Sequence, residues 1–228
     1  EFIDFCRQVG AEPYICVNVG SGTPEEAANW VEYCNGNVST SYGSLRAENG
    51  HPEPYDVKYW GIGNEMYGSW QIGYMNAEEY AQATVEFAEA MRRVDPTIKL
   101  IAVGWYEFDY WNRKVLEVAG DYFDYLSLHV YYGLGPYVED AGDYYTVVAC
   151  SLELERTLNE TSRLIDTIME GKQGKEVKIS LDEWNVWYDG EQLLTRNLQD
   201  GLFAASVFHV FQRLCNNVTM ANLALLVN

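Results

Sequence analysis

Short apolar runs rich in β-forming residues alternate along this chain with longer stretches of helical periodicity. Strands are predicted over residues 13–20, 57–63, 98–104, 123–130, 177–182 and 219–228. Helices are predicted over residues 24–35, 76–94, 111–119, 144–170 and 199–214, with a polar loop over 37–54. Because strands joined by helices of this length pair in parallel, the sequence predicts an α/β protein.

Two architectures fit this alternation. Successive right-handed crossovers produce either a doubly wound open sheet or a closed (β/α) barrel, and periodicity alone does not choose between them. The six predicted units would be three quarters of an eight-unit barrel. No Gly-x-Gly-x-x-Gly or Walker motif follows a predicted strand, so the sequence does not indicate a nucleotide cofactor.

The charge of the chain restricts its partners. Its formal net charge is −19, so it would repel phosphate backbones and anionic lipid surfaces. We therefore expect neither nucleic acid nor membrane as a partner, whereas a neutral ligand meets no such penalty. With 48% hydrophobic residues the chain has ample material for a core, which excludes intrinsic disorder.

The cysteines and histidines do not suggest a cofactor. The five cysteines lack a Cys-x-x-Cys pair, and His51 and His209 have no partners at metal-ligand spacing, so we expect no metal site, disulfide framework or organic cofactor. No signal peptide is recognisable at Glu1, and no run approaches the roughly 20 apolar residues that span a bilayer. We expect a cytoplasmic protein.

Polar residues gather where three predicted strands end. They are Asn64 and Glu65 after the second strand, His129 and Tyr131 at the fourth, and Glu183 at the fifth. Strand alternation places Glu183 on the face of Ile179 and Leu181, and Glu65 on the face of Gly61 and Gly63. If both faces point inward, the two carboxylates approach one pocket, and the two glycines leave room there for a ligand.

Paired carboxylates among tryptophans and tyrosines suit glycoside hydrolysis. One carboxyl group protonates the leaving oxygen while the other attacks the anomeric carbon, and a separation of about 5 Å gives retention of configuration. Aromatic rings such as Trp70, Trp105 and Trp187 could stack on sugars or simply belong to the core. The alternative for each glutamate is a structural ion pair with an arginine or a helix cap.

Three segments carry a family resemblance: residues 59–73 (YWGIGNEMYGSWQIG), 127–133 (SLHVYYG) and 181–188 (LDEWNVWY). Together they resemble the family 51 α-L-arabinofuranosidases, which are retaining glycosidases with a (β/α)8 TIM barrel. The resemblance implies that Glu65 is the general acid/base and Glu183 the nucleophile. It further implies that Asn64 binds the sugar 2-hydroxyl, that Tyr131 orients Glu183, and that His129 and Trp187 line the pocket.

The same resemblance implies a partial barrel. The six strands would be barrel strands three to eight, so residues 1–228 would be a single catalytic domain, truncated at both ends. Unpaired sheet edges would then favour association, with a homo-oligomer as one outcome. Leu225 stands where the family usually has a glutamine that contacts the sugar.

The expected activity is release of terminal α-L-arabinofuranosyl residues from arabinoxylan or arabinan oligosaccharides, without a cofactor. Two alternatives stay open. One is another retaining member of the same clan, such as an endo-xylanase or endo-glucanase, and the other is a non-catalytic carbohydrate-binding fragment.

Overall fold

The computed structural model describes residues 1–107, 109–134, 144–172, 175–188 and 197–224. In chain order the helices and strands are α1 (Phe2–Val9), β1 (Tyr14–Val17), α2 (Pro24–Asn35), α3 (Ser41–Glu48), β2 (Tyr59–Ile62), α4 (Ala77–Val94), β3 (Lys99–Val103), α5 (Asp109–Ala119), β4 (Tyr125–Leu134), α6 (Tyr144–Met169), β5 (Lys178–Tyr188), α7 (Leu198–Arg213) and β6 (Val218–Leu223).

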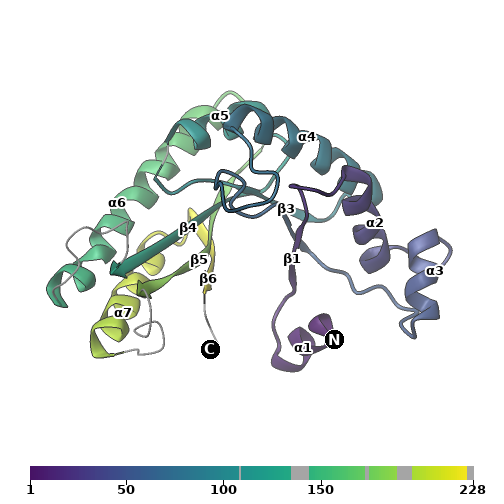
Figure 1. Ribbon diagram of the computed structural model, residues 1–228, viewed down its shortest axis with the longest axis horizontal. Helices are drawn as coiled ribbons and strands as arrows, with labels where there is room; N and C mark the ends of the chain where they lie inside the picture. Colours follow the sequence, from purple (N-terminus) through teal and green to yellow (C-terminus); the bar gives the residue numbers. More distant parts are fainter. Residues whose placement is uncertain (108, 135–143, 173–174, 189–196, 225–228) are drawn as a thin grey trace.

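The strands form one parallel sheet in the sequential order β1 to β6. An order without reversal keeps the crossover helices on one side, unlike a doubly wound sheet, whose strand order reverses. Figure 1 shows α2, α4, α5 and α6 arching around the outside of the strands, and α7 beside β5. The chain is thus an α/β protein with a curled six-stranded half-barrel, and the doubly wound alternative is wrong.

Contacts across the interior demonstrate the curl of the sheet. The Tyr14 hydroxyl on β1 donates a hydrogen bond to Asp182 Oδ2 on β5 at 2.8 Å, although three strands separate β1 from β5 in the sheet. At the end of β2, the buried Tyr80 hydroxyl of α4 donates to the Ile62 carbonyl and accepts from the Val103 amide. The carboxyl ends of β2 and β3 are thereby tied together.

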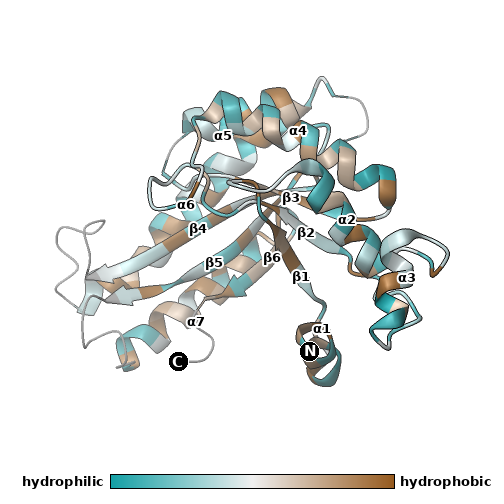
Figure 2. Cartoon of the chain, turned by 45° about the vertical axis from the view of Figure 1, so that its right-hand side comes forward, coloured by the Kyte–Doolittle hydropathy of each residue, from teal (hydrophilic) through white to brown (hydrophobic). Residues whose placement is uncertain are grey.

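Helix boundaries follow local sequence signals. Thr23 and Glu26 form a capping box at α2, and Asn76 and Glu79 form another at α4. Hydrophobic and hydrophilic residues alternate along the long helices (Figure 2), and the buried residues of α4 include Tyr80, Phe87 and Met91. Among the described residues, no helix is both long and apolar enough to cross a membrane.

Helix α3 lies where the sequence predicts a polar loop, so that prediction is wrong. Its residues show no apolar periodicity, and Thr40 caps it by accepting from the Gly43 amide. The helix is held in place by Arg46, which is fully buried and donates to the carbonyl oxygens of Tyr33, His51 and Pro52. A buried arginine bound to backbone carbonyls is a tertiary contact that local propensity does not reveal.

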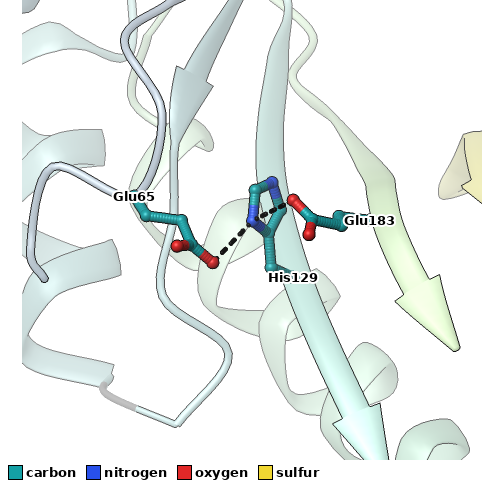
Figure 3. A group of neighbouring side chains, drawn as sticks. All are labelled: Glu65, His129 and Glu183. Carbon is teal, nitrogen blue, oxygen red and sulfur yellow. Dashed lines mark hydrogen bonds and ion pairs between the residues drawn. The ribbon is translucent and has the colours of Figure 1, made fainter. Parts of the chain in front are cut away.

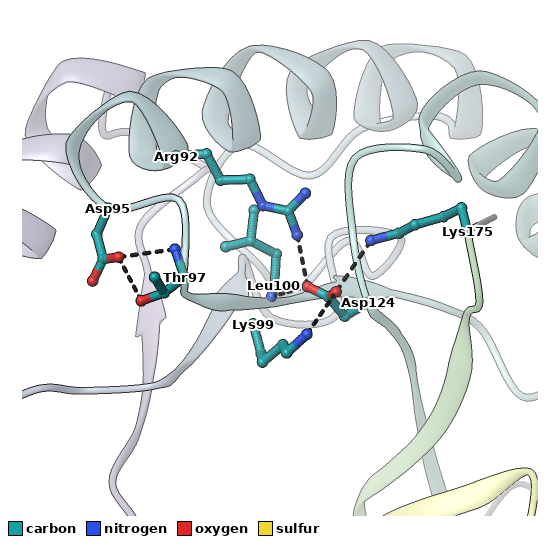
Figure 4. Close-up of polar contacts among 7 residues, drawn as sticks. All are labelled: Arg92, Asp95, Thr97, Lys99, Leu100, Asp124 and Lys175. Atoms are coloured by element: carbon teal, nitrogen blue, oxygen red, sulfur yellow. Dashed lines mark hydrogen bonds and ion pairs between the residues drawn. The ribbon is translucent and has the colours of Figure 1, made fainter. Parts of the chain in front are cut away.

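A charged cluster closes the amino-terminal side of the sheet around Asp124 (Figure 4). Its carboxylate accepts from the Leu100 amide at 2.9 Å and from Arg92 at 2.7 Å, and it pairs with Lys175 at 3.1 Å and Lys99 at 3.5 Å. Burial acts to raise the pKa of Asp124, but the Leu100 amide, Lys175 and Arg92 together lower it below its ordinary value.

We expect Asp124→Asn to lower the free energy of unfolding at neutral pH by about 2 kcal/mol, because charge-assisted hydrogen bonds are lost. Since folding lowers the pKa of Asp124, its contribution is present above the unfolded-state pKa and disappears as pH falls through the folded-state pKa. Urea unfolding at neutral pH and near pH 2.5 should show the difference between the two proteins shrinking in acid.

Asp121→Asn is the control, because Asp121 pairs with Lys172 at 3.2 Å while 53% exposed. Equal losses for both variants would contradict the prediction.

Candidate active site

A cavity of about 910 Å³ opens at the carboxyl ends of β2 to β5 and extends along α6. Seven residues singled out in the sequence line this cavity: Glu65, Trp70, Trp105, His129, Tyr131, Glu183 and Trp187. Asn64 is exposed and lies outside the lining of this cavity, next to Glu65 in the chain. Leu225 lies outside the described residues.

A turn beyond β2, rather than strand alternation, positions Glu65. The strand ends at Ile62, and both Gly63 and Glu65 have positive φ angles, of 79° and 45°. A positive φ is uncommon for a residue with a side chain, and the backbone strain it represents persists only where the surrounding structure holds it. The turn directs the Glu65 carboxylate toward β4.

The prediction that Gly61 and Gly63 leave room for a ligand is wrong. A Cβ atom on Gly61 would lie 3.0 Å from the Tyr14 ring, and one on Gly63 would lie 2.8 Å from the Met66 side chain. The two glycines therefore make space for protein side chains, and neither of them lines the cavity.

A β-bulge places Glu183. Ser127 pairs with Ser180 and His129 with Glu183, so a two-residue step on β4 faces a three-residue step on β5. The extra residue interrupts the alternation expected from Ile179 and Leu181. As a result, the consecutive residues Asp182 and Glu183 both contact His129.

His129 lies between the two glutamates (Figure 3). Its Nδ1 is 3.0 Å from Glu65 Oε1 and 3.0 Å from Glu183 Oε2, while its Nε2 is 3.4 Å from Asp182 Oδ1. Oxygens of Glu65 and Glu183 lie within 4.8 Å of each other. The Tyr131 hydroxyl donates a hydrogen bond to Glu183 Oε1.

Aromatic side chains complete the cavity. The Trp70 indole donates to Glu65 Oε2 at 2.7 Å although Trp70 is 60% exposed, so it is not a core residue. Trp105 stacks on Tyr67 with ring centroids 4.5 Å apart. Trp187 packs edge-on against Tyr131 at 5.3 Å and is 37% exposed. The wall of the cavity thus presents both apolar ring surfaces and polar atoms.

The protonation of this cluster differs from the usual division between an acid and a nucleophile. Burial acts to lower the pKa of His129, but Asp182, Glu65 and Glu183 raise it to about 10. Burial acts to raise the pKa of Glu65, but hydrogen bonds from His129 and Trp70 lower it below its ordinary value. A general acid is expected to have a raised pKa. That expectation fails for Glu65, because the imidazole of His129, whose pKa is raised, lies beside it.

Glu65, His129 and Glu183 are the one grouping in the described part of the chain with the composition of a metal site. His129 Nδ1 already contacts both carboxylates, at 3.0 Å from each. Hydrogen bonds and ion pairs therefore account for the arrangement without a metal ion.

Sequence reasoning missed Asp182, Tyr14 and Ser127. The Asp182 carboxylate is 5% exposed and accepts hydrogen bonds from the hydroxyls of Tyr14 and Ser127. Strand alternation assigned Asp182 and Glu183 to opposite faces, so only knowledge of the bulge could have placed both beside His129.

Two family models match the chain. The α-L-arabinofuranosidase 1 domain matches residues 1–147, and the α-L-arabinofuranosidase C-terminal domain matches residues 182–228. The second match begins inside β5, so its boundary falls within the sheet and not between structural units.

Curated relatives cover the whole chain. A probable α-L-arabinofuranosidase C of Aspergillus clavatus is 38% identical over 100% of this chain and 48% of its own length. An intracellular exo-α-(1→5)-L-arabinofuranosidase of Halalkalibacterium halodurans is 34% identical over 100% of this chain and 49% of its own. The chain therefore spans about half the length of these relatives.

Solved structures agree in fold and sequence. The family 51 α-L-arabinofuranosidase of Thermotoga petrophila superposes with a TM-score of 0.91 at 49% identity, over 100% of this chain and 46% of that one. The Thermotoga maritima enzyme in complex with arabinose has a TM-score of 0.90 at 48% identity, over 98% of this chain and 45% of that one. With a family model matched over residues 1–147 and relatives similar from end to end, the chain belongs to the family 51 α-L-arabinofuranosidases.

Proposed function

We propose that this chain carries the catalytic centre of a retaining glycoside hydrolase that releases terminal α-L-arabinofuranosyl residues from arabinoxylan or arabinan oligosaccharides. The observation that carries the proposal is the approach of Glu65 and Glu183 oxygens to within 4.8 Å in one cavity. Retaining glycosidases have carboxyl groups about 5 to 5.5 Å apart, whereas inverting enzymes hold them farther apart to admit a water molecule.

The reaction would be a double displacement. A Glu183 oxygen attacks the anomeric carbon while Glu65 gives its proton to the departing oxygen, which leaves an arabinosyl ester on Glu183. Glu65 then takes a proton from water as that water attacks the same carbon, which releases arabinose and frees Glu183. The hydrogen bond from Tyr131 would hold Glu183 in position for the attack.

Glu65 must be protonated when the bond breaks, although its pKa is lowered in the free site. A bound neutral sugar would displace water from the cavity, and desolvation favours the neutral carboxyl group. Glu65 would then take up the proton that His129 otherwise holds. Asn64 would bind the sugar 2-hydroxyl and Trp187 would pack against the sugar.

The place of the six strands within a complete barrel is a further part of this proposal. We infer that the six strands correspond to strands three to eight of a (β/α)8 barrel, and that residues 1–228 form a single catalytic domain. The sequential strand order, the interior contact between Tyr14 and Asp182, and the TM-scores to family 51 enzymes support this inference.

The cavity rim supports a neutral glycan as the partner. Four carboxylates line it beyond the catalytic pair, against a single arginine, Arg156: these are Glu107, Asp109, Glu153 and Glu160. Such a rim repels anionic ligands and does not penalise neutral sugars. The cytoplasmic location and the homo-oligomer stay predictions; the Halalkalibacterium halodurans relative is named intracellular.

Conversion of Glu65 to alanine tests the acid/base assignment. We expect kcat/KM for an oligosaccharide to fall roughly 10²- to 10⁴-fold, because proton donation to the leaving oxygen is lost. With an activated aryl α-L-arabinofuranoside, bond cleavage needs no acid, so a glycosyl-enzyme should accumulate. Added azide should then restore turnover and give an azide product of retained configuration.

The matched control is Glu86→Ala on the exposed side of α4, which should behave like the unchanged protein. Neither rescue by azide nor an accumulated intermediate in the Glu65 variant would contradict the assignment.

A further inference from the structure

Asp182 is a nearly buried carboxylate that has no role in the double displacement. Its side chain is 5% exposed, and in the described part of the chain its one cationic neighbour is His129, with Nε2 3.4 Å from Asp182 Oδ1. Burying a carboxylate costs several kcal/mol unless it is paired and hydrogen-bonded. A residue kept in such a position beside the catalytic pair calls for an explanation.

Hydrogen bonds from two other strands fix this carboxylate. Tyr14 on β1 donates to Oδ2 at 2.8 Å, and Ser127 on β4 donates to Oδ1 at 2.6 Å. Burial, followed by the charge of Asp182, raises the pKa of Tyr14 well above its ordinary value, so its hydroxyl remains a donor. The carboxylate is thus held rigidly at the end of a chain of contacts that crosses the interior of the half-barrel.

The contact with His129 determines how the imidazole faces the catalytic pair. With Nε2–H directed at Asp182, the opposite nitrogen, Nδ1, faces Glu65 Oε1 and Glu183 Oε2, each at 3.0 Å. Both ring nitrogens therefore face carboxylates and no donor, an arrangement that only the doubly protonated ring satisfies.

We propose that Asp182 is a positioning residue, which fixes the His129 ring between Glu65 and Glu183 and supplies the negative charge that retains the second proton on it. The proposal rests on the function proposed above and adds to it the source of the proton that Glu65 needs. In the free site the proton lies on Nδ1, one hydrogen bond from Glu65 Oε1; its transfer leaves a neutral imidazole and a protonated Glu65, with no change in the total charge.

The groups that face His129 come from several elements. They are Glu65 after β2, Asp182 and Glu183 on β5, and, near these carboxylates, Tyr14 and Cys16 on β1 and Tyr131 on β4. Burial and then Asp182 raise the pKa of the Cys16 thiol to about 12, and burial and then Glu183 raise that of Tyr131. At neutral pH the thiol and the hydroxyls are uncharged, so the three carboxylates set the charge around the imidazole.

Asp182→Asn tests the proposal through the pH dependence of catalysis. Asparagine keeps the shape of the side chain, but it replaces one accepting oxygen by an NH2 donor and removes one negative charge, so the cluster binds its remaining proton less tightly. We expect the basic limb of the kcat/KM profile to move toward acid by roughly one to three pH units, because a charge at this distance shifts a pKa by that much. At the acidic end of the profile, kcat/KM should recover more than it does near neutrality.

Tyr14→Phe is the matched control, because it removes a hydrogen bond to the same carboxylate and keeps its charge. If Asp182 acted only as a packing element, both variants would lose activity at all pH values and leave the basic limb in place. That result would overturn the proposal.

A second measurement does not need activity. In protein labelled with ¹⁵N-histidine, nuclear magnetic resonance should show the His129 ring titrating near pH 10, and Asp182→Asn should lower that midpoint by one to three units. His51 and His209, both exposed, serve as internal references and can be assigned by conversion to glutamine. A midpoint near 6.5 in the unchanged protein would overturn the proposal even if the variant failed to fold. Absence of arabinosidase activity alongside a high His129 midpoint would refute the proposed function and leave the charge relation intact.

Discussion

Replacing Glu183 by alanine is expected to lower kcat/KM for an aryl α-L-arabinofuranoside by on the order of 10⁴-fold or more, the scale seen when a covalent nucleophile is removed. The loss should be large because the glycosyl-enzyme can no longer form. Neighbouring groups do not substitute for it: the Asp182 carboxylate is 5% exposed and bound by Tyr14, Ser127 and His129. Steady-state kinetics across the pH profile measure the effect.

Azide separates the two glutamates by stereochemistry. In Glu183→Ala, azide would enter from the face that the nucleophile vacated and give a product of inverted configuration, opposite to the product expected from the Glu65 variant. Glu176→Ala is the control, because Glu176 lies just before β5, is 75% exposed and pairs with Lys178. A retained azide product from the Glu183 variant would refute its role as nucleophile.

The second large effect is expected on stability. Trp184 directly follows Glu183 in the chain, is 2% exposed, and packs against α7 with ring centroids 5.3 Å from Phe211 and 5.6 Å from Phe208. We expect Trp184→Ala to lower the free energy of unfolding by about 3 to 5 kcal/mol, as large-to-small substitutions of buried aromatic residues do. Its indole N–H has no acceptor among the described residues, so packing accounts for the whole loss.

Urea unfolding followed by circular dichroism measures this change. Trp30→Ala is the control, because Trp30 is 44% exposed and touches Trp60 edge-on at 6.1 Å. Trp30→Ala should lower the free energy of unfolding by less than half as much as Trp184→Ala does. Equal losses from the two tryptophans would contradict the prediction.

Periodicity and turn chemistry predict most of the fold. The capping boxes of Thr23 and Asn76 lie at the predicted starts of α2 and α4, and each predicted strand overlaps an observed one. Two strands are longer than predicted: β4 reaches Leu134 and β5 reaches Tyr188. Their continuation depends on pairing with each other, which is a tertiary effect.

The candidate site was predictable in its residues but less so in its geometry. Glu65, Glu183, His129, Tyr131 and Trp187 were all singled out in the sequence, and all line one cavity. Their placement depends on backbone features that a pattern of side chains does not encode, namely the positive φ of Glu65 and the bulge in β5. Asn64 is close to Glu65 in the chain but lies outside the lining of that cavity.

Electrostatics were the least predictable part. As the general acid/base that the family resemblance implies, Glu65 is expected to have a raised pKa. Three carboxylates surround one imidazole, so His129 holds the proton. The pKa of Glu65 is therefore lowered instead of raised. Such a result depends on distances of about 3 Å, within which neighbouring charges dominate a pKa.

The extra residue in β5 constrains how many residues this strand can have. Because a one-residue slip exchanges the two faces of a strand, gaining or losing a residue between Ser180 and Trp184 would turn the carboxylate outward or the indole inward. Replacing a single side chain leaves both faces of the strand in place, whereas its residue count here is constrained by chemistry on one face and packing on the other. In an alignment, that constraint would appear as a conserved number of residues between Ser180 and Trp184, more than as conserved residue types.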